Sequence, residues 1–375
     1  MRSLPVLLAV ALVGAAAAQP AQRPVAVNDT LQSVRVVGDG TVQFAIYAPE
    51  AEAVSVFGDF PNPVPYQSQA MARDAHGVWR TAVSGVPPDA YLYEFTVDGV
   101  RTFDPKNMRF KEAESVLSNV FVMPGEATDY VAVRDVPHGM VSQVWFQSDV
   151  TGAVTRFHVY TPPGYEAMDG LLPTLYLQHG GGENDASWTT AGMANVILDN
   201  MLADGQVVPM VVVMPMGHPA PGFHMAPGVD DDPYYRQLFE EIIPEVETRF
   251  RVSHEPADRA FAGLSMGGIQ ALNIALFRPE MFAYVLPLST GYFPPMLEQL
   301  ESEHADALAN PAIDDLELFW IAMGGETDIA YQNGLNTLAL LDRHGIRYET
   351  ADYPAGHTFV TWRRNLAEFA PRLFR

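Results

Sequence analysis

The hydrophobic and polar positions of this chain follow two patterns, which change near residue 137. Over 31–123 apolar and polar residues alternate with period two, most clearly at 42–46, 54–56 and 91–98. Asp98-Gly99 then supplies a hairpin turn, and other turns rich in Pro, Gly and Asp separate the alternating segments. Short alternating strands at this spacing predict an all-β, immunoglobulin-like sandwich over 31–123.

Beyond this sandwich, the pattern predicts strands that alternate with helices. The runs at 175–177 and 211–214 are short and wholly apolar, which is typical of central strands in a parallel sheet covered on both faces. Helices are expected over 238–250, 335–343 and 359–374. The alternation predicts a single α/β domain with a mostly parallel central sheet over 137–375. Pro, Gly and acidic residues break the pattern over 124–136, which we expect to be a linker.

The first residues of the chain predict an export signal. Met1-Arg2 precedes an apolar run at 4–13 and then small residues, so we expect a signal peptide over 1–18 that is cleaved near Ala18. The mature chain would begin with an extension over 19–30 and would be secreted or periplasmic. The apolar run is too short to span a membrane, and no later segment is long enough, so we expect no membrane span.

Composition narrows the chemistry that is open to this 375-residue chain. It has no cysteine, which excludes disulfides, a thiolate nucleophile and cysteine metal sites. Its 45 acidic and 22 basic residues give a net charge of −23, which disfavours nucleic acid and anionic membranes as partners. Lysine occurs only at Lys106 and Lys111, and we draw no function from this scarcity.

One pentapeptide indicates a nucleophile. The sequence Gly263-Leu264-Ser265-Met266-Gly267 has the form G-x-S-x-G and lies between a short apolar segment at 260–262 and a helix-like segment at 268–276. In a nucleophile elbow the serine occupies a strained strand-to-helix turn, and the glycines let the neighbouring backbone pass closely. Ser265 is therefore the expected nucleophile.

The partners of an elbow serine follow it in the order acid and then histidine, each after a strand of an α/β hydrolase sheet. A strand is expected over 316–323, and Asp328 in the turn after it is the expected acid. Glu326 in the same turn is the competing choice. A last strand is expected over 348–353, and His357 in the loop after it is the expected base.

An ester-cleaving serine also needs two backbone amides to bind the oxyanion. Met266, directly after the nucleophile, would supply the first amide. The second fits the glycines that follow the predicted strand at 175–178, where Gly181 is favoured and both Gly180 and Gly182 stay possible.

No cofactor or metal is expected. The remaining histidines form no ligand cluster, and the acidic triplet at 230–232 lacks the further ligands of a calcium site. Trp188, Phe223 and Tyr292 would suit the binding of an aromatic acyl group, although each could instead be a wall or core residue.

The N-terminal half resembles the early-set domains akin to family-48 carbohydrate-binding modules. The residues that carry this resemblance are Ala48-Pro49, 54–60, 77–79, 91–99 and Asp104-Pro105. Such domains precede some glycan-active enzymes, but the resemblance alone does not imply sugar binding, and we expect a structural or substrate-positioning role.

The second half resembles the esterase D-like branch of α/β hydrolases. This branch includes carbohydrate esterase family one, with its feruloyl and acetylxylan esterases, and the enterochelin esterases. The residues that carry the resemblance are 137–139, 159–165, 179–182, Trp188, 263–268, 325–328, 356–359 and Trp362-Arg363.

Together, these resemblances imply a secreted serine esterase that removes feruloyl or acetyl groups from plant polysaccharide or its oligosaccharides. Its partner would be an acylated carbohydrate or another small ester. A siderophore esterase of the enterochelin type stays an alternative, although a polyanionic substrate and an exported acidic protein fit poorly. A non-catalytic carbohydrate-binding protein on a hydrolase scaffold is the alternative of another class, although such proteins usually lose a member of the triad.

Overall fold

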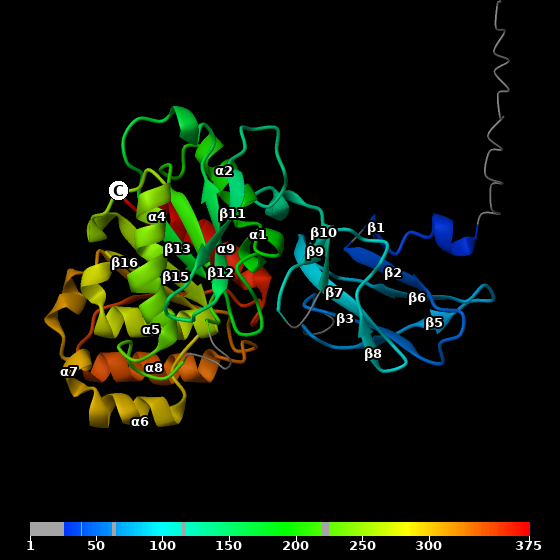
Figure 1. The fold of residues 1–375 in the computed structure, drawn as a ribbon. Coiled ribbons are helices and arrows are strands. Elements are labelled where there is room, and N and C mark those ends of the chain that lie inside the picture. The colour runs from blue at the N-terminus through cyan, green and yellow to red at the C-terminus, as the bar shows by residue number, and fades with distance from the viewer. Residues whose placement is uncertain (1–25, 39, 62–64, 115–117, 220–224) are drawn as a thin grey trace, which may run out of the picture.

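The computed structural model describes residues 26–38, 40–61, 65–114, 118–219 and 225–375. The signal peptide expected over 1–18, most of the extension over 19–30, and Phe223 lie outside the described residues. The chain forms two domains that pack side by side (Figure 1).

The N-terminal domain is a sandwich of two antiparallel sheets. One sheet has the order β1 (Val34–Gly38), β2 (Thr41–Tyr47), β6 (Val78–Val83), β5 (Ala72–Arg73). The other has the order β4 (Gln69–Ala70), β3 (Val54–Gly58), β7 (Asp89–Val97), β10 (Ser118–Met123), β9 (Phe110–Lys111), with β8 (Val100–Thr102) pairing β7. The alternating apolar residues fill the space between the sheets, where the rings of Phe44 and Tyr93 lie 5.1 Å apart.

The C-terminal domain contains a mixed sheet of eight strands. In spatial order they are β11 (Met140–Gln147), β12 (Val154–Thr161), β14 (Val211–Pro215), β13 (Thr174–Gln178), β15 (Arg259–Leu264), β16 (Tyr284–Leu288), β17 (Leu318–Met323) and β18 (Glu349–Asp352). The pairs β11–β12 and β12–β14 are antiparallel, and the pairs from β14–β13 to β17–β18 are parallel.

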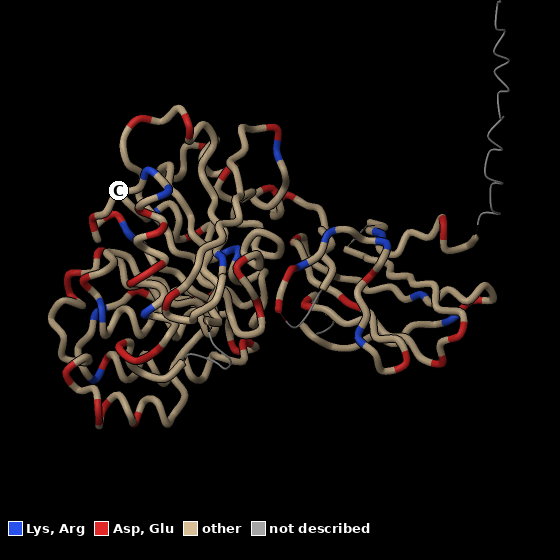
Figure 2. Tube along the Cα trace, viewed as in Figure 1, with Lys and Arg blue, Asp and Glu red and all other residues tan. Residues whose placement is uncertain are grey.

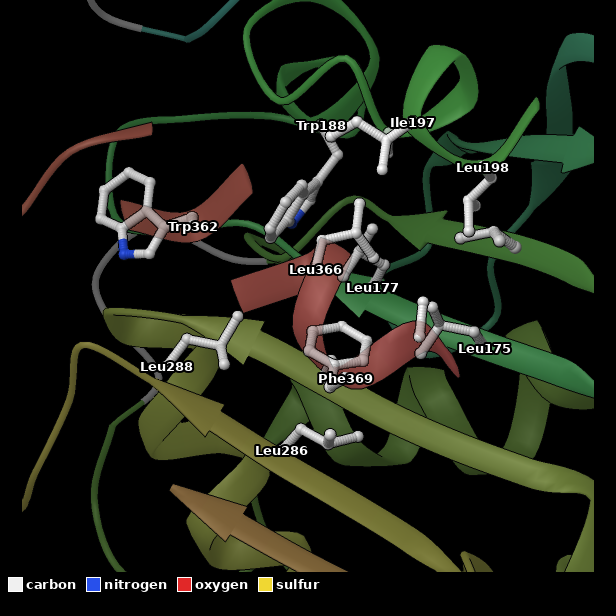
Figure 3. Close-up of a cluster of buried hydrophobic side chains, with 14 of the residues drawn as sticks. Leu175, Leu177, Trp188, Ile197, Leu198, Leu286, Leu288, Trp362, Leu366 and Phe369 are labelled. Carbon is white, nitrogen blue, oxygen red and sulfur yellow. The ribbon is translucent and has the colours of Figure 1, made fainter. Parts of the chain in front are cut away.

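Helices cover both faces of this sheet, which explains why the middle residues of its central strands are apolar. Leu175 and Leu177 pack with α1 (Ser187–Thr190), α2 (Ala194–Ala203) and α9 (Phe359–Phe369) on one face (Figure 3). Tyr176, between them, faces the opposite core. Helices α3 (Pro233–Arg236), α4 (Ile243–Arg249), α5 (Met266–Phe277), α6 (Pro294–Glu303), α7 (Ala305–Leu308) and α8 (Tyr331–Arg343) contribute to that core or adjoin it.

All three expected helices differ in their bounds or form. The helix expected over 335–343 is α8, which begins earlier, at Tyr331. The helix expected over 238–250 is a π-helical segment, Gln237–Ile242, followed by α4. The helix expected over 359–374 ends at Phe369 and continues only as a short 3-10 turn, Ala370–Arg372. Pro371 lies in that turn, where its ring cannot continue an α-helix.

The two domains share buried contacts. Ala90 and Leu92 of β7 belong to the core that contains α2 and α9, and Val360 of α9 belongs to the core of the sandwich. Arg363 of α9, with a side chain only 1% exposed, contacts Asp89 of the sandwich at 3.0 Å. Within the segment expected as a linker, Val131 is also buried in the C-terminal core. The junction is therefore packed like the inside of a domain.

Acidic residues outnumber basic ones, and both kinds occur in many parts of the molecule (Figure 2). Acidic segments are spread over both domains, and basic segments are fewer (Figure 2). Across the described part of the chain, no helix has the length and apolar character needed to cross a membrane.

Candidate active site

Ser265 lies on the strained turn that the pentapeptide predicts. Strand β15 ends at Leu264 and helix α5 begins at Met266, so Ser265 alone makes the turn, with φ 55° and ψ −113°. A positive φ is costly for a residue with a side chain and needs support from its surroundings. The Ser265 amide donates to the Leu288 carbonyl at 2.9 Å, and the Thr290 hydroxyl donates to the Ser265 carbonyl at 2.9 Å.

The elbow glycines are required because backbone passes close to them. A Cβ atom at position 263 would lie 2.2 Å from the carbonyl oxygen of Gly267. A Cβ atom at position 267 would lie 2.6 Å from the carbonyl oxygen of His179, the residue that follows β13. Any side chain at either position would therefore push the serine turn away from the sheet.

Strand register brings the three expected triad residues to one edge of the sheet. Leu264 pairs with Leu288, Leu288 pairs with Ala322, and Met323 pairs with Asp352. These pairs lie at the ends of neighbouring parallel strands. The segments that follow them carry Ser265, Asp328 and His357, so these residues leave the sheet at the same edge.

Asp328 and His357 are in direct contact. Nδ1 of His357 lies 2.7 Å from Oδ1 of Asp328, whose side chain is fully buried, whereas Glu326 is exposed. The structure thus pairs the histidine with the first of the two candidate acids. The Asp328 oxygens also accept from the amides of Gly324 at 3.1 Å and Ala330 at 2.9 Å.

The environment of Asp328 keeps its carboxyl group ionised. Burial alone would raise its pKa, but the hydrogen bond and charge of His357 and the Ala330 amide outweigh burial and lower the pKa below its usual value. An ionised Asp328 accepts the Nδ1–H of His357, so whenever the imidazole carries a single proton its Nε2 is free to accept another. The Trp362 ring lies perpendicular to that of His357, with the two centroids 5.1 Å apart, and helps to hold the imidazole in place.

The glycine loop after β13 adjoins the nucleophile. A Cβ atom at position 180 would lie 3.2 Å from the Cβ of Ser265. The Gly180 amide is already bonded to Oε2 of Glu183, at 3.3 Å, whereas Gly181 is exposed to solvent. On the elbow, the Met266 amide belongs to the first helical residue of α5, where amides have no partner within the helix.

Two of the expected substrate contacts are wrong. Trp188 is 1% exposed, donates its Nε1–H to the Gln178 carbonyl at 3.0 Å and packs in the core with Leu366 (Figure 3). Tyr292 is 0% exposed and donates its hydroxyl to Asn273 at 2.7 Å. Both rings fill space between helices and sheet, so neither can contact a substrate. Phe223 lies outside the described residues.

Two residues of the acidic triplet have structural partners. Asp232 caps α3 by accepting from the Tyr234 amide at 2.8 Å, and Asp230 pairs with Arg278. Among the described residues, no group of three or more His, Asp or Glu side chains is arranged to hold a metal ion.

Three further residues lie at this edge of the sheet, and the sequence pattern did not predict them as part of the site. The Tyr66 hydroxyl, from the sandwich, donates to the His357 carbonyl at 3.1 Å. Lys111, also from the sandwich, contacts Oε1 of Glu183 at 3.2 Å. The scarcity of lysine was the one signal that singled out Lys111, and nothing in the local pattern singled out Tyr66 or Glu183.

Comparison with known families identifies the C-terminal domain. Residues 148–373, more than half of the chain, match the family model described as "Putative esterase". The chain belongs to this esterase family. Residues 32–110 match carbohydrate-binding module 48, the isoamylase N-terminal domain. The two resemblances drawn from the sequence are therefore confirmed, and with them the expected enzyme class.

Curated relatives share much of the esterase chain but are longer. The endo-1,4-beta-xylanase/feruloyl esterase of Xylanibacter ruminicola is 32% identical over 352 residues, which cover 91% of this chain and 46% of that protein. Endo-1,4-beta-xylanase Y of Acetivibrio thermocellus is 27% identical over 188 residues, which cover 47% of this chain and 17% of that protein. The chain thus spans less than half the length of either relative.

Solved structures share the fold of the esterase. An enterobactin esterase of Shigella flexneri, solved with 2,3-di-hydroxy-N-benzoyl-serine, superposes with a TM-score of 0.68 at 18% identity, over 91% of this chain and 96% of that one. The feruloyl esterase module of Clostridium thermocellum superposes with a TM-score of 0.56 at 21% identity, over 71% of this chain and 96% of that one. At such identities these likenesses concern the fold alone.

Proposed function

We propose that this esterase is a serine carboxylic ester hydrolase in which Ser265, His357 and Asp328 form the catalytic triad. The observation that carries the proposal is the 2.7 Å contact between His357 Nδ1 and the buried Asp328, at the sheet edge where the strained Ser265 turn lies. Ser265 is half-buried and the His357 side chain is 15% exposed, so an ester can reach both.

The reaction proceeds through an acyl-enzyme. His357 Nε2 takes the Ser265 proton as Oγ attacks the ester carbonyl carbon, and the amides of Met266 and Gly181 bind the resulting oxyanion. Asp328 offsets the charge of the imidazolium. The intermediate collapses as His357 gives its proton to the leaving alcohol. Water, deprotonated by His357, then attacks the acyl-enzyme, and His357 returns this proton to Ser265 Oγ as the bond between Oγ and the acyl carbon breaks and the acid leaves.

The substrate class is a feruloyl or acetyl ester of a plant polysaccharide or its oligosaccharides. Support comes from the Xylanibacter ruminicola relative, which is named as a xylanase and feruloyl esterase, and from the family-48 match of the N-terminal domain. The expected signal peptide fits an enzyme that meets polysaccharide outside the cytoplasm.

A siderophore ester is the second candidate, because the enterobactin esterase superposes over 91% of the chain, including both domains. The net charge of −23 opposes a polyanionic substrate such as ferric enterobactin. A purely carbohydrate-binding role is disfavoured because the acid and the base keep the contact that catalysis requires.

The test is a substrate panel with the wild type and Ser265→Ala. We expect the wild type to hydrolyse nitrophenyl acetate and either methyl ferulate or acetylated xylan faster than ferric enterobactin, and Ser265→Ala to lose about 10⁴-fold or more in kcat. Ser302→Ala, an exposed serine of α6, is the matched control and should retain wild-type activity. Turnover by Ser265→Ala at the wild-type rate would refute the proposal.

A further inference from the structure

The N-terminal sandwich contacts the catalytic edge of the neighbouring domain through polar side chains. Lys111, on β9, lies against Glu183 in the loop that follows the glycines. Both side chains are largely buried, with exposed fractions of 12% and 9%. The Lys111 ammonium also lies 5.8 Å from the centre of the Phe359 ring, at the start of α9.

Glu183 in turn fixes the glycine loop at two points. Its Oε2 accepts from the Gly180 amide at 3.3 Å, and its own amide donates to the Gly180 carbonyl at 3.3 Å. The same carbonyl lies 2.8 Å from Nδ1 of His179. Burial lowers the pKa of His179 to about 4, so the imidazole is neutral near pH 7. Its Nδ1–H donates to the Gly180 carbonyl while Nε2 accepts from the Gly217 amide at 2.9 Å.

These bonds set the direction of the Gly181 amide. The peptide unit that joins Gly180 to Gly181 is planar and trans, so its N–H points opposite to its C=O. The backbone amide of Glu183 and the His179 imidazole hold the Gly180 carbonyl, so they determine where the Gly181 N–H points. The Glu183 carboxylate holds the amide on the other side of Gly180 and so fixes the residue from which this peptide unit starts. That amide is the second oxyanion donor in the proposed mechanism, and an oxyanion donor must be aligned in advance to be effective.

We propose that Lys111 of the sandwich is a positioning residue of the esterase, which acts through Glu183 to orient the oxyanion loop. The inference rests on the proposed serine mechanism. Lys111 neutralises a buried carboxylate that would otherwise repel the developing oxyanion and would favour water over the Gly180 amide. The sandwich therefore completes the catalytic centre, in addition to any contact with carbohydrate.

A second contact from the sandwich reaches the base side of the same centre. Tyr66 donates its hydroxyl to the His357 carbonyl, and its own amide donates to the Gly58 carbonyl at 2.7 Å, which ties it to the end of β3. Although Tyr66 as a whole is 44% exposed, desolvation around its hydroxyl, followed by the carboxylates of Asp59, Glu183 and Asp328, raises the pKa of the phenol, so the hydroxyl stays a donor. The same domain thus supports both the oxyanion loop and the histidine loop.

The test is a double-mutant cycle in the full chain, with nitrophenyl acetate as substrate. We expect Lys111→Met to lower kcat about tenfold with KM within twofold of wild type, and Lys111→Arg to restore most of the loss. Because Lys111 acts through Glu183, the same substitution in a Glu183→Gln background should change kcat less than twofold. Lys106→Met changes the other lysine, which is exposed, and should behave as wild type.

A transition-state analogue separates positioning from general stability. A trifluoromethyl ketone forms a tetrahedral adduct on the serine, so its affinity for Lys111→Met should fall by the same factor as kcat/KM. Unfolding temperatures of all variants show whether they fold, and Lys111→Arg provides a folded comparison if Lys111→Met does not. Wild-type kcat in a folded Lys111→Met variant, or full additivity with Glu183→Gln, would overturn the inference. Activity retained by Ser265→Ala would instead overturn the proposed mechanism itself.

Discussion

The two sides of the catalytic centre are built in different ways. On one side, Ser265, Asp328 and His357 each follow a strand of the C-terminal sheet, and strand register alone brings them to one edge. On the other side, Tyr66 and Lys111 come from a separate sandwich and reach the centre across a domain junction. The first side depends on local turns, and the second depends on how two domains pack.

The reacting groups and the sandwich residues that support them therefore come from different domains. The sheet side carries the groups that would exchange protons or bind the oxyanion, whereas the sandwich side contacts the backbone of His357 and the side chain of Glu183 rather than the reacting atoms. Loss of a sheet-side group should therefore nearly abolish turnover, while loss of a sandwich-side group or junction contact should change turnover or stability by smaller amounts. The following substitutions test this ordering.

The largest effect is expected at the acid. Asp328→Asn should lower kcat by about 10⁴-fold, because the amide no longer holds the His357 tautomer or offsets the imidazolium charge. Glu326→Gln, in the same turn but exposed, is the control and should stay within twofold of wild type. Steady-state kinetics with nitrophenyl acetate measure both. If Glu326→Gln were the damaging change, the acid would be misassigned.

A smaller effect, on stability, is expected at the junction. Arg363→Met should lower the free energy of unfolding by about 3 kcal/mol, because it removes one partner of a buried ion pair with Asp89 and the bond to the Ala191 carbonyl. Arg347→Met removes an exposed pair with Asp314 and should cost about 0.5 kcal/mol or less. Urea unfolding compares the two variants. Equal losses would mean that the junction does not support the fold.

The smallest effect is expected in the pH dependence of stability. Burial raises the pKa of Asp59 from 3.8 to about 7, with Arg363 and the Leu92 amide opposing the rise and Asp89 adding to it. The protonated carboxyl contributes to the free energy of unfolding. This contribution is present in full below pH 3.8, and it is lost as the pH rises through about 7.

Asp59→Asn should remove this dependence while keeping the acceptor for the Leu92 amide. Between pH 5 and pH 8 the wild type should lose about 2 kcal/mol more stability than the variant. Urea unfolding at the two pH values measures the difference. Parallel profiles for the two proteins would show that Asp59 does not titrate differently in the folded state.

The sheet side could be anticipated because its signals are local. Apolar runs marked the central strands, G-x-S-x-G marked the serine turn, and chain order after the elbow pointed to Asp328 and His357. The structure adds the choice between Asp328 and Glu326, since only coordinates show which carboxylate reaches the imidazole. It also shows that Pro371 lies beyond the end of α9, in a 3-10 turn.

The remaining features depend on long-range packing. An aromatic residue near a motif could line a pocket or fill a core, and the pattern around Trp188 and Tyr292 is the same in both cases. Both side chains are buried under helices in the structure, which makes them core residues. Likewise, Lys111 and Glu183 are 72 residues apart in sequence and meet only because the sandwich docks on the C-terminal domain. Period and spacing carry no information about such a contact.

The most direct test of the central claim is covalent labelling of the wild type with a fluorophosphonate, followed by peptide mapping and residual activity. If Ser265 is the nucleophile, the label will lie on the peptide that contains Ser265, and activity will fall in proportion to labelling. Label on a different residue, or activity that persists when Ser265 is fully labelled, would contradict the proposed mechanism.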